Sequence, residues 1–335
     1  MSTISDVANL AGLSRATVSR VINNHPNVSE EKKKLVLNAM EQLNYVPNTT
    51  AQRLRNQKTD TIAILVPVLT NPFFAYLLEA MDTVATRNDF QLLVCQTRYD
   101  REKELNFLDL LKKKQVDGLI LTSCENDWDI ISDYSKFGPI VLCNEQSSEA
   151  GVPAVRMDNT EAAYLATRHM IEQGCRKIAY SYGEKKSSVA LERETGFKQA
   201  LEENGLPINE RWFINNVYDI EDGRRALRYL AGLKDRPDGI FTGSDQVATG
   251  FIMEAKKQGI CIPGDLAVAG FDNQPIASVI DPPLTTVAQP IKQMGTKAME
   301  TMIEVILHKQ ELSYQEILLP FELIVRGSTQ RNSII

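Results

Sequence analysis

The pattern of apolar and polar positions changes character near residue 60 of this chain. Before that point, apolar residues recur every three or four positions in three short stretches, a spacing that predicts amphipathic helices. From Thr61 onward, short apolar runs alternate with longer amphipathic stretches, which is typical of buried strands covered by helices. The pattern therefore predicts a small all-α head followed by a large α/β body.

Residues 3–23 contain two of the predicted helices and the turn between them. The apolar positions of the first helix share one face: Ile4, Val7, Ala8 and Ala11. Gly12 ends this helix, Leu13 fills the turn, and Ser14 can cap the next helix by accepting a backbone N–H. This arrangement is a helix-turn-helix, in which the second helix reads base edges in DNA.

The second helix has two different faces when its residues are placed at intervals of about 100°. The aliphatic face, which can seat on the first helix, consists of Val18, Val21 and Ile22. The opposite face consists of Arg15, Ala16, Ser19 and Arg20. Arginine can bind both major-groove acceptors of a guanine, and Ser or Thr can hold phosphates. The alternative is an ordinary surface helix with two solvated arginines.

A third helix completes the head. We expect it to begin after Ser29, which can cap it, with Glu30 and Glu31 at its positive end. Its apolar positions, which close a small three-helix core, are Val36, Met40 and Leu43. The chain must leave the helix before Pro47, because proline disfavours helical geometry in the residue that precedes it.

Five segments of the first 48 residues carry a specific pattern: Asp6-Val7-Ala8, Ala11-Gly12-Leu13-Ser14, Thr17-Val18-Ser19-Arg20-Val21-Ile22-Asn23, Val28-Ser29 and Leu43-Asn44-Tyr45-Val46-Pro47-Asn48. This pattern resembles that of the lactose-repressor (LacI/GalR) family of transcriptional regulators. The resemblance implies a double-stranded DNA operator as a partner. It also implies these DNA contacts in the head: Thr3, Ser14, Arg15, Ala16, Thr17, Ser19, Arg20 and Asn23.

Residues 48–60 are polar and contain one prominent apolar side chain, Leu54. A flexible linker is one interpretation of such a composition. The resemblance implies instead a hinge that folds into a short helix on the operator, where leucine side chains enter the minor groove and bend the DNA. Leu54 occupies the position of that leucine, with Asn48 and Ala51 on the same side.

The distribution of charge supports a DNA-binding head. The net charge of the whole chain is −6, which taken alone argues against nucleic acid. The first 60 residues, however, hold 8 Lys and Arg against 5 Asp and Glu, a balance of +3. The remaining residues hold 29 against 38, a balance of −9. A basic reader fused to an acidic body fits this asymmetry.

The composition indicates the cellular compartment and argues against several classes of protein. The five cysteines have no metal-site spacing, and three lie in apolar runs, so we expect buried reduced thiols of a cytoplasmic protein. The amino terminus has no apolar leader, and no apolar run reaches membrane-spanning length, so no membrane is expected. The three histidines have no metal spacing, and nucleotide-loop and nucleophile-elbow motifs are absent. We therefore expect neither an enzyme nor a cofactor or metal.

The body reads as two α/β lobes. Its strand-like runs are 62–66, 91–95, 118–122, 140–143, 177–182, 239–242 and 266–270. Its helical stretches are 73–88, 101–113, 161–172, 193–204, 222–233 and 246–258. Such alternation predicts two doubly wound parallel sheets, which bind ligands beyond the carboxyl ends of their strands.

The resemblance implies a body like that of periplasmic binding proteins, with a cleft between two lobes and three chain crossings, near Asp158, Gln289 and Leu319. We thus expect four parts. They are a DNA-binding domain (residues 1–47), a hinge (48–60), an amino-terminal lobe (61–158 plus 290–318) and a carboxy-terminal lobe (159–289 plus 319–335).

Asn71-Pro72-Phe73-Phe74 follows the first strand of the body and suggests one wall of an effector site. Asn71 can cap the next helix and Pro72 can take its first turn, with both Phe packed inside. Adjacent helical residues point about 100° apart, however, so both rings should not enter one core. We expect at least one to face the cleft, because the segment resembles the sugar-stacking turn of ribose-binding proteins.

Polar residues at other strand ends complete the predicted site. Asn144, Asp245 and Asp272 each stand at the end of a strand or just beyond, and carboxylates and amides suit the hydroxyls of a polyol. The resemblance implies effector contacts for Asn144, Asp272 and Arg193, and an aromatic wall from Tyr218. Asn144 departs from the family, which usually has an acid there. A helix cap is the alternative role for Asp245, and an ion pair for Arg193.

The charge of the effector stays open at this point. Residues 183–188 could hold a phosphate at the start of a helix, or could form a solvated loop. We favour the loop and expect a neutral or weakly charged carbohydrate.

These observations predict a ligand-controlled transcription regulator, most often a repressor in this family. Two chains should pair through their bodies and place two reader helices on a palindromic site. No long heptad run follows the last strand, so a dimer is expected rather than a tetramer. A solute-binding protein for transport is the alternative, although it would have no use for a basic head.

Overall fold

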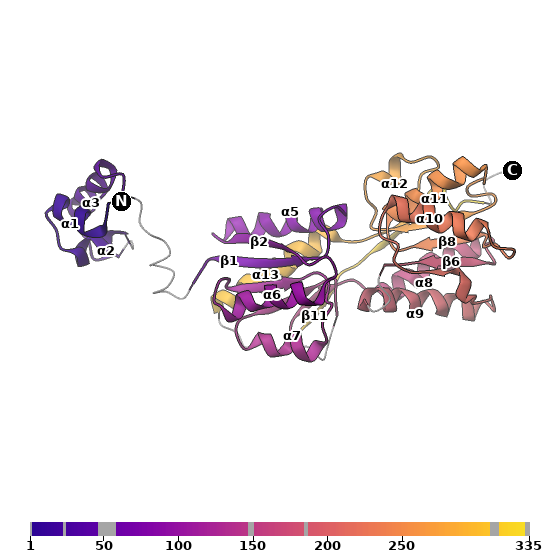
Figure 1. Ribbon diagram of the computed structural model, residues 1–335, viewed down its shortest axis with the longest axis horizontal. Coiled ribbons are helices and arrows are strands. Elements are labelled where there is room, and N and C mark those ends of the chain that lie inside the picture. Colours follow the sequence, from indigo (N-terminus) through magenta and orange to yellow (C-terminus); the bar gives the residue numbers. More distant parts are fainter. Residues whose placement is uncertain are drawn as a thin grey trace. The chain divides into compact units, whose positions relative to one another are not determined.

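The structure, a computed structural model, describes residues 2–22, 25–45, 58–146, 151–183, 187–308 and 315–331. The chain divides into two compact units, Met1–Lys58 and Thr59–Ile335. The first unit is the head and the second is the body, and Figure 1 shows the elements of each.

Three helices form the head: α1 (Ile4–Ala11), α2 (Arg15–Ile22) and α3 (Glu30–Gln42). Gly12 ends α1 in the left-handed conformation, with φ of 64°, as expected for a glycine at this position. The buried core consists of Val7, Ala8, Val18, Val21, Val36 and Ala39. The expected core residues Met40 and Leu43 are only partly buried, and the small Ala39 lies between the helices instead.

The first sheet of the body has six parallel strands in the order β11-β5-β4-β3-β1-β2. The strands are β1 (Thr61–Val66), β2 (Gln91–Gln96), β3 (Gly118–Leu121), β4 (Ile140–Cys143), β5 (Ala154–Arg156) and β11 (Glu316–Leu318). The order reverses beside β1, where Ile62 pairs with Leu92 on one side and with Gly118 on the other. Such a reversal is the place where open α/β sheets bind ligands.

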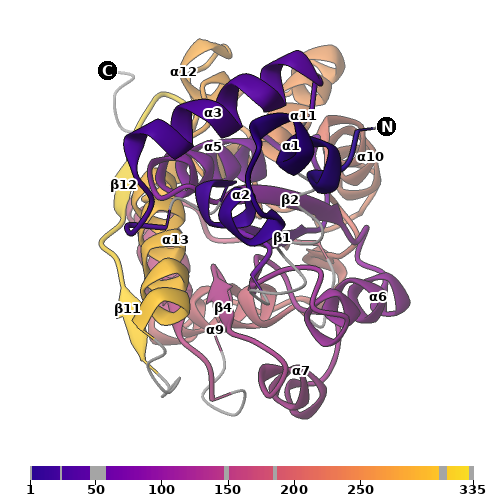
Figure 2. The same ribbon diagram turned by 90° about the vertical axis from the view of Figure 1, so that its left-hand side faces the viewer.

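Helices cover both faces of this first sheet. Helices α5 (Pro72–Arg87) and α13 (Ile291–His308) pack together on one face with Ile62, Ile64 and Val66 of β1. Helices α6 (Arg101–Lys112) and α7 (Trp128–Ser135) lie on the other face, which receives Ala63 and Leu65. Figure 2 shows α13 and α6 on opposite sides of this lobe. Because both faces are covered, β1 is a continuous apolar run rather than an alternating one.

The second sheet repeats this arrangement with one change. Its order is β12-β10-β9-β8-β6-β7, and β12 runs antiparallel to β10, whereas two wholly parallel sheets were expected. The strands are β6 (Ile178–Ser181), β7 (Phe213–Ile214), β8 (Gly239–Thr242), β9 (Ala267–Phe271), β10 (Thr285–Ala288) and β12 (Glu322–Ile324). Strand β12 differs from the others of this sheet because the chain reaches it directly from β11 of the first sheet, without a connecting helix.

Four longer helices and two short ones cover the second sheet. Helices α8 (Asn159–Glu172) and α9 (Ser188–Glu203) share one apolar cluster with the sheet. Helices α10 (Ile220–Ala231), α11 (Asp245–Gln258) and α12 (Ile276–Val279) contribute to the other. A 3-10 turn, η1 (Glu210–Trp212), precedes β7.

The α8–α9 pair is packed so closely that its backbones touch. A Cβ atom at Gly196 of α9 would lie 1.9 Å from the carbonyl oxygen of Thr160 in α8. Only glycine allows this approach, since no side-chain movement could relieve a contact with backbone.

The chain passes between the two sheets three times: from β5 to β6, from β10 to β11, and from β11 to β12. Figure 1 shows the two resulting lobes joined by these segments. None of the helices in the ranges given above is long and apolar enough to cross a membrane.

Candidate functional site

Helix α2 of the head presents the two-faced arrangement that its sequence predicts. Val18 and Val21 are buried, whereas Arg15, Ala16 and Arg20 are exposed. Thr17 and Ser19 lie between these extremes. The exposed side of the helix is therefore cationic and carries a small residue between its arginines, so that a nucleic-acid backbone can approach it closely.

Hydroxyl groups cap both helices of this motif. The Ser14 hydroxyl accepts a hydrogen bond from the Thr17 backbone N–H at 3.1 Å, as expected for a cap of α2. Thr3 caps α1 by accepting from the Asp6 N–H at 3.3 Å, and Asp6 accepts from the Thr3 N–H at 2.8 Å in return. The Thr3 N–H and the Thr3 hydroxyl both donate to the Asp6 carboxylate, and these two hydrogen bonds lower its pKa. Sequence reasoning assigned Thr3 to DNA and missed this reciprocal cap.

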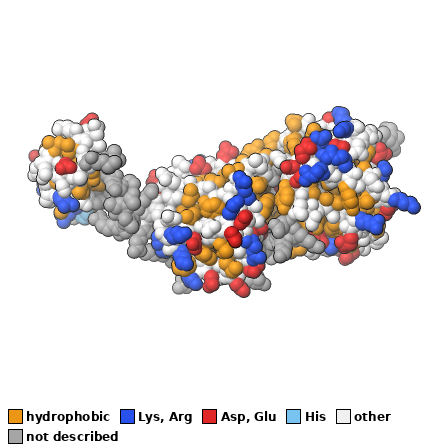
Figure 3. Space-filling model, viewed as in Figure 1, with side chains coloured by type: hydrophobic (Ala, Val, Ile, Leu, Met, Phe, Trp, Pro, Cys, Tyr) orange, Lys and Arg blue, Asp and Glu red, His pale blue; other side chains and the backbone are white. Residues whose placement is uncertain are grey.

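Other predicted DNA contacts cannot be placed, because Asn23, Asn48, Ala51 and Leu54 lie outside the described residues. In the body, a group of charged side chains lies over α10 and α11 (Figure 3). Its members pair with one another: Arg224 with Glu221 at 2.7 Å, and both Arg224 and Arg228 with Glu254 at 3.2 Å. The arginines of this group are thus neutralised locally, which makes them poor candidates for contacts with DNA phosphates.

A cavity of about 150 Å³ lies between the lobes, at the carboxyl ends of the strands of both sheets. Seven of the eight predicted effector residues line it: Asn71, Phe73, Phe74, Asn144, Arg193, Tyr218 and Asp272. Asn71, Asn144, Tyr218 and Asp272 come from the loops after β1, β4, β7 and β9, Phe73 and Phe74 from the first turn of α5, and Arg193 from α9. These seven residues, which are far apart in the sequence, therefore line one cavity.

Both phenylalanines of the 71–74 segment line the cavity, and both also belong to the same apolar core. Their rings meet edge to face with centroids 5.0 Å apart. The expectation that one core could not receive both rings was wrong, because α13 packs beside α5 and the two rings contact each other. Asn71 caps α5 through a hydrogen bond from the Phe73 N–H at 3.0 Å.

Asp272 is the most completely bonded carboxylate of the cavity. It accepts hydrogen bonds from the side-chain amides of Gln289, at 2.6 Å, and Gln274, at 2.9 Å. Burial raises its pKa to about 6, and the nearby Arg193 acts in the opposite direction. Its φ of 103° turns the chain sharply after β9 and brings the carboxylate into the cavity.

Arg193 is buried and is held by neutral oxygens. Its guanidinium donates to Oδ1 of Asn159 at 2.9 Å and to the carbonyl of Gly243 at 3.1 Å. It also lies 3.5 Å from the centre of the Phe271 ring. Among the described residues no carboxylate comes within 4.0 Å of it, so the alternative of a structural ion pair is not what the structure shows. Burial lowers its pKa, and Asp272 raises it.

Asp245 is the exception among the predicted residues. It does not line the cavity, because its carboxylate accepts from the Thr286 hydroxyl and from the Gln274 N–H, each at 2.6 Å. Nor does it cap α11, since Ser244 does so by accepting from the Val247 N–H at 3.3 Å. Asp245 instead stabilises the loop that contains Asp272 and Gln274, through its hydrogen bond with the Gln274 N–H.

Three important residues of the cavity were missed by sequence reasoning: Tyr99, Glu145 and Gln289. Each stands within three residues of the end of a strand, so the signal that located Asn144 and Asp272 was available for them too. Glu145 directly follows Asn144, is buried, and accepts a hydrogen bond from the Ser188 hydroxyl. Burial, together with the neighbouring carboxylates Glu125, Glu192 and Glu104, raises its pKa to about 8, although the Ser188 hydrogen bond acts in the opposite direction.

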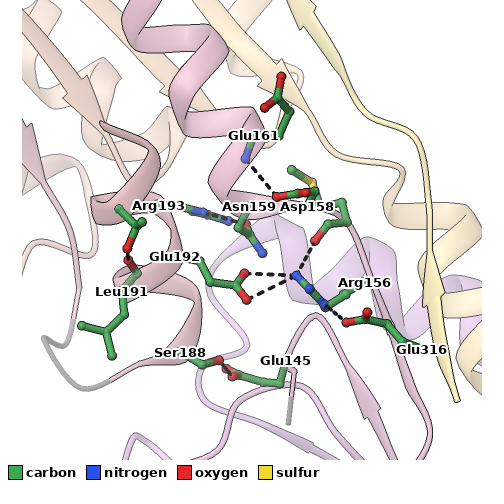
Figure 4. Close-up of polar contacts among 12 residues, drawn as sticks. Glu145, Arg156, Asp158, Asn159, Glu161, Ser188, Leu191, Glu192, Arg193 and Glu316 are labelled. Atoms are coloured by element: carbon green, nitrogen blue, oxygen red, sulfur yellow. Dashed lines mark hydrogen bonds and ion pairs between the residues drawn. The ribbon is translucent and has the colours of Figure 1, made fainter. Parts of the chain in front are cut away.

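Several contacts join the two lobes around the cavity. Gln274 of the second lobe donates to Asn71 of the first at 3.0 Å, and the rings of Tyr99 and Tyr218 lie 5.1 Å apart. Arg156 at the end of β5 pairs across the lobes with Glu192 of α9 at 3.2 Å, and within its own lobe with Glu316 of β11 at 2.6 Å (Figure 4). The Glu145–Ser188 contact lies beside this network.

The sequence patterns of two known protein groups match this chain. The pattern of bacterial regulatory proteins of the LacI family matches residues 3–48, and that of periplasmic binding proteins and the sugar-binding domain of the LacI family matches residues 59–326. The chain belongs to the LacI family of bacterial regulatory proteins. The family assignment agrees with the two-part structure, and the transport-type alternative lacks the matched head.

Full-length relatives are regulators. The chain is 43% identical to the NTD biosynthesis operon regulator NtdR of Bacillus subtilis (strain 168), over 98% of this chain and 100% of that one. It is 36% identical to the transcriptional regulator DegA of the same organism, over 98% of both. The lac repressor dimer bound to operator and an anti-inducer superposes with a TM-score of 0.86 at 25% identity, over 98% of this chain and 99% of that one. This LacI-family protein is a transcriptional regulator.

The pKa of Glu145 makes a prediction for stability. Unfolded, this carboxyl titrates near 4.5, and folded near 8, so the folded state of the wild-type protein loses stability as pH rises between these values. A Glu145→Gln variant lacks this loss. The free energy of unfolding of the variant minus that of the wild type should therefore rise by up to about 1.4 kcal/mol per pH unit from pH 5 to 8. Above pH 8 this difference should become constant.

Urea unfolding of the ligand-free proteins across this pH range measures the difference. Glu202→Gln, on the exposed side of the same helix as Ser188, is the matched control and should show no such trend. A difference between Glu145→Gln and wild type that does not change with pH contradicts the assignment.

Proposed function

We propose that this LacI-family regulator is an operator-binding repressor whose affinity for DNA is set by a small molecule in the interlobe cavity. The observation that carries this proposal is the position of the cavity. It touches both lobes at their strand ends, and polar and aromatic contacts cross it. A ligand there must alter how the lobes meet, and any differential affinity for two lobe arrangements shifts the population between them.

We propose a carbohydrate or carbohydrate derivative as the effector. The rings of Phe73, Phe74, Tyr99 and Tyr218 can cover the apolar faces of a sugar, while amides and carboxylates bind its hydroxyls. Structural neighbours support this class of ligand. A LacI-family regulator of Lactobacillus casei with bound sucrose has a TM-score of 0.73 at 30% identity, covering 80% of this chain and 99% of that one.

The division of labour along the chain follows. In the head, the exposed face of α2 contacts bases and phosphates through Arg15, Ala16, Thr17, Ser19, Arg20 and Asn23, with Thr3 and Ser14 at the helix starts. Asn48, Ala51 and Leu54 of the 48–60 hinge contact the minor groove. The lobes, 61–158 plus 290–318 and 159–289 plus 319–335, bind the effector. The protein acts in the cytoplasm, where its operator is, and by binding rather than by catalysis.

A dimer is part of this proposal. β2 is an edge strand of the first sheet, and it exposes Leu93 and Val94 to solvent. Leu69, in the loop after β1, and Tyr76 of α5 are also more than 40% exposed, and we take these four side chains as the apolar dimer surface. An exposed edge strand with apolar side chains usually has a partner. Pairing of two bodies through this surface would present two reader heads to a palindromic site.

Arg20→Ala should weaken operator binding and reduce its dependence on salt. A lost base contact costs about 1–3 kcal/mol, and each lost phosphate contact lowers the slope of log K against log salt by about 0.9. Mobility-shift titrations at several salt concentrations, on a duplex selected by the wild type from random DNA, measure both. Arg87→Ala, an exposed arginine in the body, is the control. Wild-type affinity and slope in Arg20→Ala would remove Arg20 from the interface.

Asp272→Ala should abolish the response of DNA binding to the effector while operator binding itself is kept. Loss of the carboxylate removes a ligand contact and also the acceptor that orients the side-chain amides of Gln289 and Gln274. A sugar that shifts the wild-type operator titration is added to both proteins, with exposed Glu202→Ala as control. A normal response in Asp272→Ala would exclude this residue from the effector site.

The wild-type protein should sediment with the mass of two chains in the absence of DNA. Leu93→Asp places a charge in the middle of the apolar edge and should shift the population toward single chains. The exposed Leu37→Asp in the head should not. A wild-type protein that sediments as a stable tetramer or as a single chain would overturn the dimer.

A further inference from the structure

The cavity is lined by more acidic groups than basic ones. Its charged lining residues are Glu125, Glu145, Asp272 and Arg193, which are three carboxyl groups against one guanidinium. Asp272 and Arg193 influence each other most among the charged groups, and Asp272 also has two amide donors. Glu145 is different, because the surroundings that the structure describes do not balance its charge.

The groups around Glu145 are mostly acidic. They come from α6, the loop after β3, and α9: Glu104, Cys124, Glu125, Ser188, Glu192 and Arg193. Ser188 donates one hydrogen bond to the Glu145 carboxylate, which also lies near the amino-terminal end of α9. Within the described ranges no Lys or Arg nitrogen lies within ion-pair distance of it, and Arg193 interacts electrostatically more with Asp272 than with Glu145. An ionised carboxylate buried in this way is costly unless a cation joins it.

Two buried hydrogen-bond acceptors that line the cavity also lack partners among the described residues. Oδ1 of Asn144, which is only 8% exposed, has no partner among the described residues. Oε1 of Gln289, which is 9% exposed, likewise has none. The orientation of Gln289 is fixed, because its amide nitrogen donates to the Asp272 carboxylate, and a carboxylate can only accept. The lining of the cavity is therefore complementary to a ligand that donates several hydrogen bonds.

We propose that the effector of this regulator carries a protonated amine, and that Glu145 binds the ammonium group with Asn144 beside it. An ammonium group has three N–H donors and no acceptor, so it satisfies the carboxylate and the amide oxygen together. The aromatic rings and the Asp272–Arg193 side suit a sugar ring, so the ligand class is an amino sugar or a similar polyhydroxylated amine. This inference rests on the proposed function, since it concerns the same cavity.

Binding of such a ligand should release a proton. In the empty cavity at pH 7 the Glu145 carboxyl is largely protonated, because its pKa is raised to about 8. When the ammonium group arrives, the O–H bond of Glu145 breaks, its proton goes to the buffer, and the carboxylate pairs with the intact ammonium. A neutral sugar leaves the proton in place. Proton release thus distinguishes the two ligand classes by a readout that does not depend on affinity.

The experiment uses the full chain and matched probes: glucosamine, galactosamine and mannosamine, each with its neutral parent sugar and its N-acetyl derivative. Thermal shift at pH 7 selects the members that bind, and titration calorimetry in two buffers of different ionisation enthalpy measures affinity and proton release. We expect at least one amine to bind ten-fold or more tightly than its parent and its N-acetyl form, with close to one proton released. Glu145→Gln should remove that preference, and Glu202→Gln should keep it.

Each other outcome overturns the inference. If a neutral sugar binds as tightly as its amine, or if Glu145→Gln keeps the preference, the amine assignment fails while the effector function stands. If no probe of any kind binds, both fail. Lys185 and Lys186 lie outside the described residues, so a Lys185→Gln/Lys186→Gln variant is included. An amine preference that appears only in this variant would mean that a lysine of the chain already neutralises Glu145, and the inference would be wrong. Should Glu145→Gln not fold, proton release by the wild type still decides.

Discussion

The common direction of neighbouring strands is the constraint on which the cavity depends. Ten of the twelve strands given above run parallel to every partner they have, so the loops that follow them emerge at one edge of each sheet. The two edges face each other across the cavity. Residues more than 100 positions apart, such as Asn71 and Gln274, therefore meet without any local signal that connects them. The chemistry of the site is a property of the loops, and its location is a property of the sheets.

Sequence reasoning was most successful where a pattern is long and periodic. The seven predicted strands and six predicted helices of the body are all present, with ends that differ by a few residues, the largest difference being the start of α9. Of the strands that were missed, β5, β7, β11 and β12 are two or three residues long, too short to show any period, and β10 has four residues. Helix α13 was missed although Met294, Ala298 and Met302 recur at helical spacing, so its omission was avoidable.

The candidate site shows where one-dimensional reasoning ends. A strand end tells which loop faces the cavity, but not which of its side chains points inward, because that depends on how the backbone turns. Asn144, with φ of 73°, and the adjacent Glu145 both line the cavity, and only the first was predicted. Asp245 ends a strand in the same way and yet lies beneath the site, since Thr286 and Gln274 bind its carboxylate. Such partners come from parts of the chain that are distant in the sequence, so the residues around Asp245 do not predict them.

The glycine contact between α8 and α9 has a consequence for signalling. Ser188, Glu192 and Arg193 all lie on α9, and they reach Glu145, Arg156 and the cavity wall in turn. Because Gly196 seats α9 directly on the backbone of α8, the helix has no soft side-chain layer in which to slide on its own. A displacement of any one of these three residues should therefore move α8 and α9 together as one rigid unit. The lobe is then expected to switch between discrete arrangements rather than to deform continuously.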